Sequence, residues 1–224
     1  MSTPFHQLQL PPLISISVAA LNASVPWLSA EEQVSSSGMA VARRTEFAHG
    51  RLHARRALAQ LGLPEASLPV ATDRSPQWPE GFVGSISHVP ADAAQNLAGQ
   101  VVAVAALQCD YASIGVDLER TGTLQPEHWH HFLTPGELDW LAARPPSERC
   151  RLAHGLWSAK EAVMKALRQP LEPQDIEIRV SDDERRFSAN GRLDGSSDAL
   201  PVSGWFSFEP GWVMALSFWG QSPN

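Results

Sequence analysis

The sequence predicts an α+β fold, because two long amphipathic helical stretches are interspersed with short strand-like runs. Residues 43–61 and 148–168 have the apolar spacing of helices, whereas residues 101–107 and 114–119 have the patterns of strands. The helices interrupt groups of strands instead of alternating with them one by one. This order favours antiparallel pairing over a doubly wound parallel sheet.

The first long helix is predicted over residues 43–61, with Gly62 placed to end it. Arg44, Arg51 and Arg55 form a line along this helix, and a solvated helix face is the ordinary interpretation of such a line. The apolar residues on another side of the same helix are Phe47, Ala54, Leu58 and Leu61.

A buried strand is predicted over residues 101–107, which are continuously apolar up to Leu107. The next strand, residues 114–119, alternates, so Asp117 and Glu119 lie on one face. Two carboxylates on one face repel each other unless a cation lies near them, and Mg²⁺ prefers oxygen ligands. The alternative is a solvated edge strand, with Glu119 paired to Arg120.

Two further helices are predicted in the second half. Thr134 suits an N-cap and Glu137 the N3 position of a capping box. Residues 148–168 form the longer helix, and strand-like pieces follow it at 176–180, 205–208 and 212–218. The longer helix has an apolar stripe of Leu152, Leu156, Ala159, Val163 and Leu167. A second stripe contains Trp157, Glu161, Lys165 and Arg168.

Lysine is rare in this chain: of 17 cationic residues only Lys160 and Lys165 are lysines, and they stand five residues apart. They lie about 140° apart around the helix, so they could flank an extended polyphosphate but not contact one atom together. Glu161 could supply a third carboxylate to a metal ion. It could equally form an ordinary i,i+4 ion pair with Lys165.

Two other segments contain polar groups. The stretch Gly84-Ser-Ile-Ser-His88 offers Ser87 and His88 as phosphate ligands, or is simply a turn followed by a strand. The second segment, residues 128–131, contains three histidines. Their spacing does not match that of a metal site, and a solvated loop is the better interpretation of this segment. The three histidines are His128, His130 and His131.

Composition excludes several classes of protein. The net charge of −7 disfavours a nucleic-acid partner, and two widely spaced cysteines give neither a disulfide framework nor a zinc site. The N-terminus does not read as a signal peptide, and no apolar run is long enough to insert stably in a membrane. We therefore expect a cytoplasmic protein.

The order of the motifs resembles the 4′-phosphopantetheinyl transferase superfamily over residues 40–170. A basic helix is followed by W-P-x-G-x-x-G-S-I-S-H, G-V-D-L-E, a T-P-x-E helix start and W-S-A-K-E-A-V-M-K. The chain looks like the larger, monomeric surfactin-synthetase (Sfp) type and closest to the enterobactin-synthetase branch. That resemblance implies two similar halves related by a pseudo-twofold axis, residues 1–118 and 119–224. Each half would be a small, mostly antiparallel sheet packed on a long helix, and the active site would lie between them.

The resemblance also implies the reaction, a Mg²⁺-dependent transfer of 4′-phosphopantetheine from coenzyme A to a carrier-protein serine that releases 3′,5′-ADP. Asp117, Glu119 and Glu161 would hold Mg²⁺, with Glu161 also the candidate general base. Lys165 would stabilise the leaving group. The residues implied to contact the coenzyme A phosphates are Arg43, Arg44, Arg51, Arg74, Ser87, His88, Lys160 and Lys165.

The implied partner is an apo acyl or peptidyl carrier protein, and the enterobactin-like look favours siderophore peptide synthesis. An acidic carrier could dock on arginines near Phe132 and Leu133, although a solvated loop is an equal alternative. These arginines are Arg144, Arg149 and Arg151. Two other functions stay open: a non-catalytic homologue that binds carriers, and a Mg²⁺-dependent phosphodiesterase or nuclease.

Overall fold

The computed structural model describes residues 13–92, 97–169, 171–191 and 202–220. The chain divides between Ile114 and Gly115 into two compact units, called unit 1 and unit 2 below. The predicted boundary after residue 118 lies four residues further along the same strand, β4 (Ser113–Arg120), and would separate Asp117 from Glu119. The structure keeps both carboxylates in unit 2.

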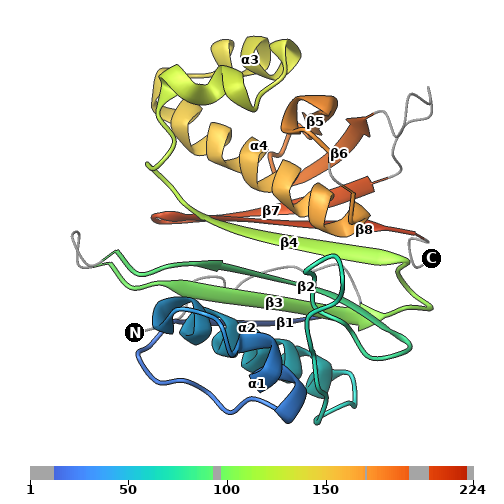
Figure 1. Ribbon diagram of the computed structural model, residues 1–224. Coiled ribbons are helices and arrows are strands. Elements are labelled where there is room, and N and C mark those ends of the chain that lie inside the picture. Colours follow the sequence, from blue (N-terminus) through green and yellow to red (C-terminus); the bar gives the residue numbers. More distant parts are fainter. Residues whose placement is uncertain (1–12, 93–96, 170, 192–201, 221–224) are drawn as a thin grey trace. The chain divides into compact units, whose positions relative to one another are not determined.

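Unit 1 contains a three-stranded antiparallel sheet in the order β1-β3-β2. Its strands are β1 (Ile14–Ala20), β2 (Phe82–Val89) and β3 (Gln100–Leu107). The long helix α2 (Val41–Gln60) packs against all three strands, and the short helix α1 (Ala30–Ser36) precedes it (Figure 1). The predicted helix 43–61 and strand 101–107 are confirmed to within two residues at each end.

The arginine line on α2 does not form a solvated face. Arg51 and Arg55 are only 5% and 8% exposed. Arg55 forms an ion pair with the fully buried Glu32 at 2.7 Å, and Arg51 stacks on Phe47 with its guanidinium carbon 4.2 Å from the ring centroid. The prediction failed because the acidic partner lies on α1, 23 residues away from Arg55.

Unit 2 contains a five-stranded sheet in the order β4-β8-β7-β6-β5. The last four strands in the sequence pair antiparallel with one another. They are β5 (Ile176–Val180), β6 (Arg186–Gly191), β7 (Val202–Glu209) and β8 (Trp212–Trp219). The fold is therefore a mixture of helices and antiparallel sheets, as the sequence predicts.

The helix α4 (Pro146–Leu167) lies across the sheet of unit 2 and forms its core (Figure 1). Most of the predicted apolar stripe is buried, with Leu152, Leu156, Ala159 and Val163 at most 2% exposed. The shorter helix α3 (Pro135–Ala142) begins with the predicted capping box of Thr134 and Glu137. Two 3-10 turns, η1 (Pro126–His131) and η2 (Pro173–Asp175), complete the unit.

In the part of the chain that the structure describes, no helix has the length and apolarity needed to cross a bilayer.

The backbones of β4 and α4 approach closely at Gly115. A Cβ atom at this residue would lie 2.0 Å from the Ala162 carbonyl oxygen and 2.7 Å from the Ala166 nitrogen. Ser217 of β8 donates a hydrogen bond to the same Ala162 carbonyl at 2.7 Å. Glycine at position 115 therefore sets how near α4 lies to the strand that carries Asp117 and Glu119.

We expect Gly115→Ala to lower the free energy of unfolding by about 1–3 kcal/mol. The added methyl group would clash with backbone atoms of α4, which cannot move away as a flexible side chain can. Gly136→Ala is the matched control, since its Cβ would meet only the Glu177 carboxylate at 3.7 Å. The control should change stability by less than about 0.5 kcal/mol. Urea titration of the three proteins measures both effects, and equal stabilities would contradict the close approach.

Unit 1 buries an imidazole that should make its stability depend on pH. His53 is 2% exposed and its Nδ1 lies 2.8 Å from the Ser17 hydroxyl oxygen. Burial lowers the pKa of His53 from 6.5 to about 4, with the nearby Arg56 and His49 adding to the effect. Between these two values the unfolded chain binds a proton that the folded chain does not.

We expect the free energy of unfolding to fall as the pH drops from 7 to 4.5, with His53 contributing roughly 2 kcal/mol. His53→Asn keeps a side chain near the Ser17 hydroxyl but cannot titrate, so its stability should fall less over the same interval. Urea titrations of both proteins at the two pH values check this. A variant as sensitive to acid as the parent protein would show that His53 is not responsible.

Candidate active site

The three predicted acidic ligands all belong to unit 2, where β4 supplies Asp117 and Glu119 and α4 supplies Glu161. Asp117 is 4% exposed. Burial, together with the charge of Asp117, raises the pKa of Glu119 to about 7, and Glu161 adds to this shift. Burial also raises the pKa of Glu161, opposed by Lys165 and assisted by Asp117. Each glutamate thus lies within the electrostatic range of the other acids.

Two side chains of α4 reach these acids directly. The Lys165 ammonium lies 2.6 Å from the Asp117 carboxylate and donates to the Val116 carbonyl at 3.3 Å. About two turns earlier on α4, the Trp157 indole N–H donates to Glu119 Oε1 at 3.0 Å. The second predicted stripe of this helix therefore faces the acidic face of β4. The indole donor to Glu119 was missed by sequence reasoning, although Trp157 lies in that stripe.

The donor set suits a hard divalent cation. Among the described residues, no three His, Cys, Asp or Glu side chains stand close enough together to form a finished metal cage. Mg²⁺ does not require one, since it is usually held by one or two carboxylates together with water and substrate phosphates. A cation beside Asp117 and Glu119 would also offset the burial and the carboxylate repulsion that together raise the pKa of Glu119. The residues present therefore fit Mg²⁺.

Lys160 does not face the acids. It is 0% exposed, and its ammonium contacts the Glu137 carboxylate at 2.8 Å and the carbonyls of Pro173 and Ile176 at 2.7 and 2.6 Å. Burial lowers the pKa of Lys160 and raises that of Glu137, while their mutual attraction opposes both shifts. All three ammonium protons are engaged within the protein, so this environment does not support the expected phosphate contact of Lys160.

Unit 1 brings together two of the predicted phosphate ligands. Arg43 approaches His88 with 2.8 Å between its NH1 and Nε2 of the imidazole, and it forms an ion pair with Glu46 at 3.2 Å. A guanidinium can only donate, so Nε2 accepts and a neutral His88 carries its proton on Nδ1, 3.8 Å from Glu46. Glu46 was missed by sequence reasoning, and its spacing of three residues from Arg43 was the available signal.

The other predicted phosphate ligands of unit 1 lie in different environments. Ser87 precedes His88 on β2 and is 6% exposed. Arg44 and Arg74 are exposed, and Arg74 has a φ of 68°. Arg51 is buried, and its Nε donates to the Leu68 carbonyl, so its expected contact with coenzyme A is not supported.

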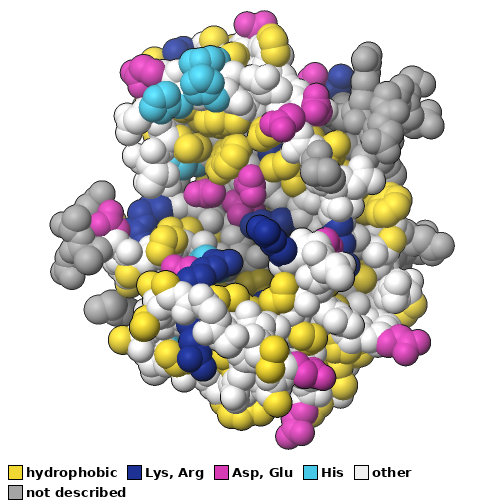
Figure 2. All heavy atoms as spheres, viewed as in Figure 1, with side chains coloured by type: hydrophobic (Ala, Val, Ile, Leu, Met, Phe, Trp, Pro, Cys, Tyr) yellow, Lys and Arg dark blue, Asp and Glu magenta, His cyan; other side chains and the backbone are white. Residues whose placement is uncertain are grey.

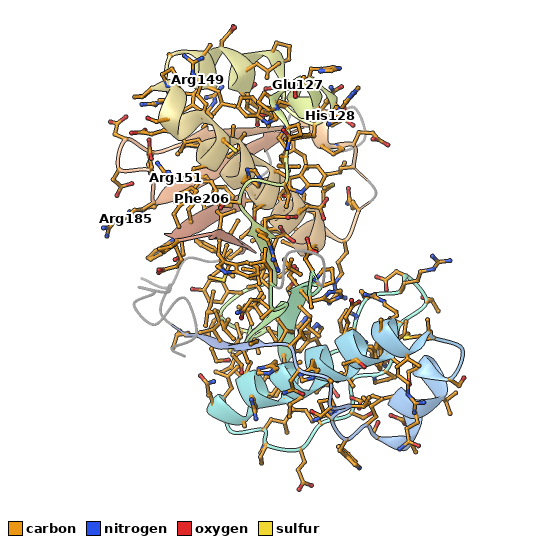
Figure 3. The ribbon with its side chains drawn as sticks, turned by 90° about the vertical axis from the view of Figure 1, so that its left-hand side faces the viewer. Glu127, His128, Arg149, Arg151, Arg185 and Phe206 are labelled. Carbon is orange, nitrogen blue, oxygen red and sulfur yellow. The ribbon has the colours of Figure 1, made fainter. Side chains whose placement is uncertain are left out.

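The arginines of the predicted carrier dock are engaged within unit 2. Figure 3 labels Arg149 and Arg151, which both lie on α4. Arg149 donates to the carbonyls of Arg144 and Ala142 at the end of α3, whereas Arg151 pairs with Glu184 at 2.8 Å. The guanidinium of Arg144 stacks on Trp140, and that of Arg151 on Phe208. The expected apolar part of the dock is absent from the surface, because Phe132 and Leu133 are 7% and 1% exposed.

The histidines of η1 lie at the surface, as expected of a solvated segment. His128, His130 and His131 are exposed, and the His131 ring lies near both others, tilted by 43° to that of His130 with 3.9 Å between their centroids. Figure 2 shows histidine side chains gathered in this way on the visible face. They are not gathered into a metal site in the described part of the chain.

Comparison with known proteins identifies the family. Residues 30–103 match a model of the 4′-phosphopantetheinyl transferase N-terminal domain, and residues 113–215 match a model of the 4′-phosphopantetheinyl transferase superfamily. The 4′-phosphopantetheinyl transferase PptT of Mycobacterium tuberculosis is 31% identical over 194 residues, 77% of this chain and 77% of PptT. This chain belongs to the 4′-phosphopantetheinyl transferase superfamily.

Two further members of the superfamily match shorter segments. The transferase Svp of Streptomyces mobaraensis is 37% identical over 167 residues, 70% of this chain, and Npt of Nocardia iowensis is 34% identical over 124 residues, 55% of it. These matches span 63% of Svp and 51% of Npt, less than two thirds of either. The crystal structure of the holo-[acyl-carrier-protein] synthase of Thermotoga maritima is similar over 48% of this chain and 63% of the synthase chain. The sequence identity is 18% and the TM-score is 0.41, so the likeness is distant.

The buried Glu137–Lys160 pair predicts a defect in stability and not in substrate binding. We expect Lys160→Met to lower the free energy of unfolding by about 3–5 kcal/mol, because Glu137 then keeps an uncompensated buried charge. Adding Glu137→Gln should recover part of the loss, since glutamine keeps the capping box without the charge. Urea titration checks both. If Lys160→Met left the stability unchanged and raised the KM for coenzyme A, the result would support a contact between Lys160 and a phosphate of coenzyme A.

Proposed function

We propose that this chain transfers the 4′-phosphopantetheine arm of coenzyme A to a serine of an apo acyl or peptidyl carrier protein, releasing 3′,5′-ADP. One observation carries the proposal. The segment that matches the superfamily model, residues 113–215, gathers electrostatically coupled carboxylates from β4 and α4, with a lysine in contact with one of them. Such a constellation suits the handling of a pyrophosphate, whose negative charge needs both a metal ion and a cation.

In unit 2 we propose that Asp117, Glu119 and Glu161 would hold Mg²⁺ together with water and the substrate pyrophosphate, since the three carboxylates do not form a closed cage by themselves. When bound, the ion supplies Lewis-acid polarisation of a phosphoryl oxygen and neutralises charge that develops there. The carrier serine attacks the phosphorus that bears the pantetheine arm, the bond from this phosphorus to the oxygen of 3′,5′-ADP breaks, and Glu161 accepts the hydroxyl proton. Lys165, which is 32% exposed and reaches Asp117, is placed to stabilise the departing phosphate.

In unit 1 we propose the pair of Arg43 and His88 as ligands of the 3′-phosphate. The Arg43 side chain is 57% exposed, so its remaining donors are accessible to a ligand. Exposed Arg44 and Arg74 would add positive charge, whereas Arg51 and Lys160 are left out of the proposed site because both are buried.

Several finer assignments stay predictions. They are the surfactin-synthetase type, the pseudo-twofold relation between the halves, a monomeric and cytoplasmic protein, and a siderophore pathway. A panel of apo carriers from siderophore, polyketide, peptide and fatty-acid synthases tests the last of these. A siderophore enzyme should modify the carrier of siderophore synthesis with the highest kcat/KM of the panel.

The transfer itself is tested by the intact mass of an apo carrier after incubation with coenzyme A and Mg²⁺. We expect the carrier to gain the mass of one phosphopantetheine arm, and we expect chelation by EDTA to abolish the gain. Asp117→Asn should reduce kcat by at least about 100-fold, since it removes a charged ligand. Asp139→Asn, which changes an exposed carboxylate on α3, is the matched control and should leave kcat unchanged.

Two results would refute the proposal. Carrier binding without a change in carrier mass would indicate a non-catalytic homologue, and Mg²⁺-dependent cleavage of a plasmid in place of transfer would indicate a nuclease. A fully active Asp117→Asn variant would leave the transfer intact and remove the metal assignment.

A further inference from the structure

A buried histidine ties α4 to the chain that follows β4. His154 is 0% exposed and lies on α4 one turn before Trp157. Its Nε2 atom is 3.2 Å from the backbone nitrogen of Thr123 and 3.1 Å from that of Leu124. These two residues follow the last residue of β4, Arg120, by three and four positions.

The hydrogen bonds fix the tautomer of this imidazole. His154 Nδ1 lies 2.7 Å from the Cys150 carbonyl oxygen, which can only accept, so Nδ1 carries the proton. The Nε2 lone pair is then free to accept from the two backbone N–H groups. Burial lowers the pKa of His154, which favours the same neutral form. The imidazole thus bridges a carbonyl of α4 and two amides of the segment after β4.

This bridge lies beside the candidate active site. Trp157, three residues after His154 on α4, donates its indole N–H to Glu119 at 3.0 Å. Glu119 is separated from Thr123 by only three residues. The end of β4 is therefore held to α4 twice, through the backbone by His154 and through a carboxylate by Trp157.

We propose that His154 is a positioning residue, which holds the end of β4 so that Glu119 keeps its hydrogen bond to Trp157. Its effect on phosphopantetheine transfer rests on the proposed function, but its effect on the Glu119–Trp157 contact does not. A metal ligand with one oxygen bound by an indole has a fixed orientation, and loss of such outer contacts costs about 10- to 100-fold in metal affinity or activity. His154 acts one contact further out, so we expect the lower end of that range.

Two conservative variants distinguish the role of Nε2 from that of Nδ1 in the His154 ring. His154→Gln places an amide oxygen near the position of Nε2 and can still accept from Thr123 and Leu124. His154→Asn reaches only the position of Nδ1, so it can keep the bond to the Cys150 carbonyl but loses the acceptor. Both variants remove the same ring from the same buried site, so each controls for the packing defect of the other.

The first measurement needs no substrate. We expect amide hydrogen exchange at Thr123 and Leu124 to accelerate at least 10-fold in His154→Asn and to change little in His154→Gln. The amide of Thr121, bonded to the Gly211 carbonyl at 3.0 Å, is the internal reference and should keep its rate. The indole N–H resonance of Trp157 should shift in His154→Asn alone, reporting the lost bond to Glu119.

The second measurement is the transfer reaction. We expect kcat to fall about 10-fold in His154→Asn, with an unchanged KM for the carrier protein and a higher Mg²⁺ concentration at half-maximal rate. His154→Gln should stay within about threefold of the parent protein. Equal losses in the two variants, or equal acceleration of all three amides, would overturn the proposal and leave His154 a packing residue.

Nitrogen NMR of the unsubstituted protein gives a test that survives even if both variants fail to fold. At neutral pH the His154 ring should show a protonated Nδ1 and an unprotonated, hydrogen-bonded Nε2. A protonated Nε2 would overturn the proposal, because that atom could not accept from the amides. If the His154 ring has this protonation state but the protein does not transfer the phosphopantetheine arm, the proposed function is refuted. The bridge formed by His154 between α4 and the segment after β4 is then still supported.

Discussion

The candidate active site depends on how closely α4 lies along β4. Glycine at position 115 lets the two backbones approach, and Ser217 holds the Ala162 carbonyl from β8. On this base, Trp157 and Lys165 reach Glu119 and Asp117 with distances of 3.0 and 2.6 Å. Because these contacts join one helix to one strand, any shift of the helix changes both together.

The local part of this arrangement could be predicted from the sequence. The apolar stripe of α4, the capping box at Thr134 and the alternation of Asp117 and Glu119 are short-range patterns, and all three are present. They could be predicted because helical and strand periodicity alone decides which residues share a face. The motifs then identified the family, since their order is far more specific than any one of them.

The environments of the charged residues could not be predicted in this way. Arg55 is buried because Glu32 meets it from α1, and Lys160 is buried because Glu137 meets it from α3. A sequence pattern places a charge on a helix face but does not say whether a partner from a distant segment covers that face. Charged residues are rarely buried unless they are paired, so the solvated face was the better expectation for the arginine line, although it was wrong. For Lys160 the expectation was a phosphate contact, which likewise took no account of a buried partner.

The two lysines show why this chain uses an ammonium group where its other cations are guanidinium groups. Lys160 makes three contacts of 2.6–2.8 Å, one to Glu137 of α3 and two to carbonyls of the stretch from Pro173 to Ile176. An ammonium directs three protons in a pyramid and can meet such acceptors, whereas a guanidinium is flat and directs its donors in one plane. The same compactness lets the Lys165 ammonium sit between the Asp117 carboxylate and the Val116 carbonyl. The use of lysine at these two positions is therefore explained by geometry, but only the Lys165 ammonium remains accessible for chemistry.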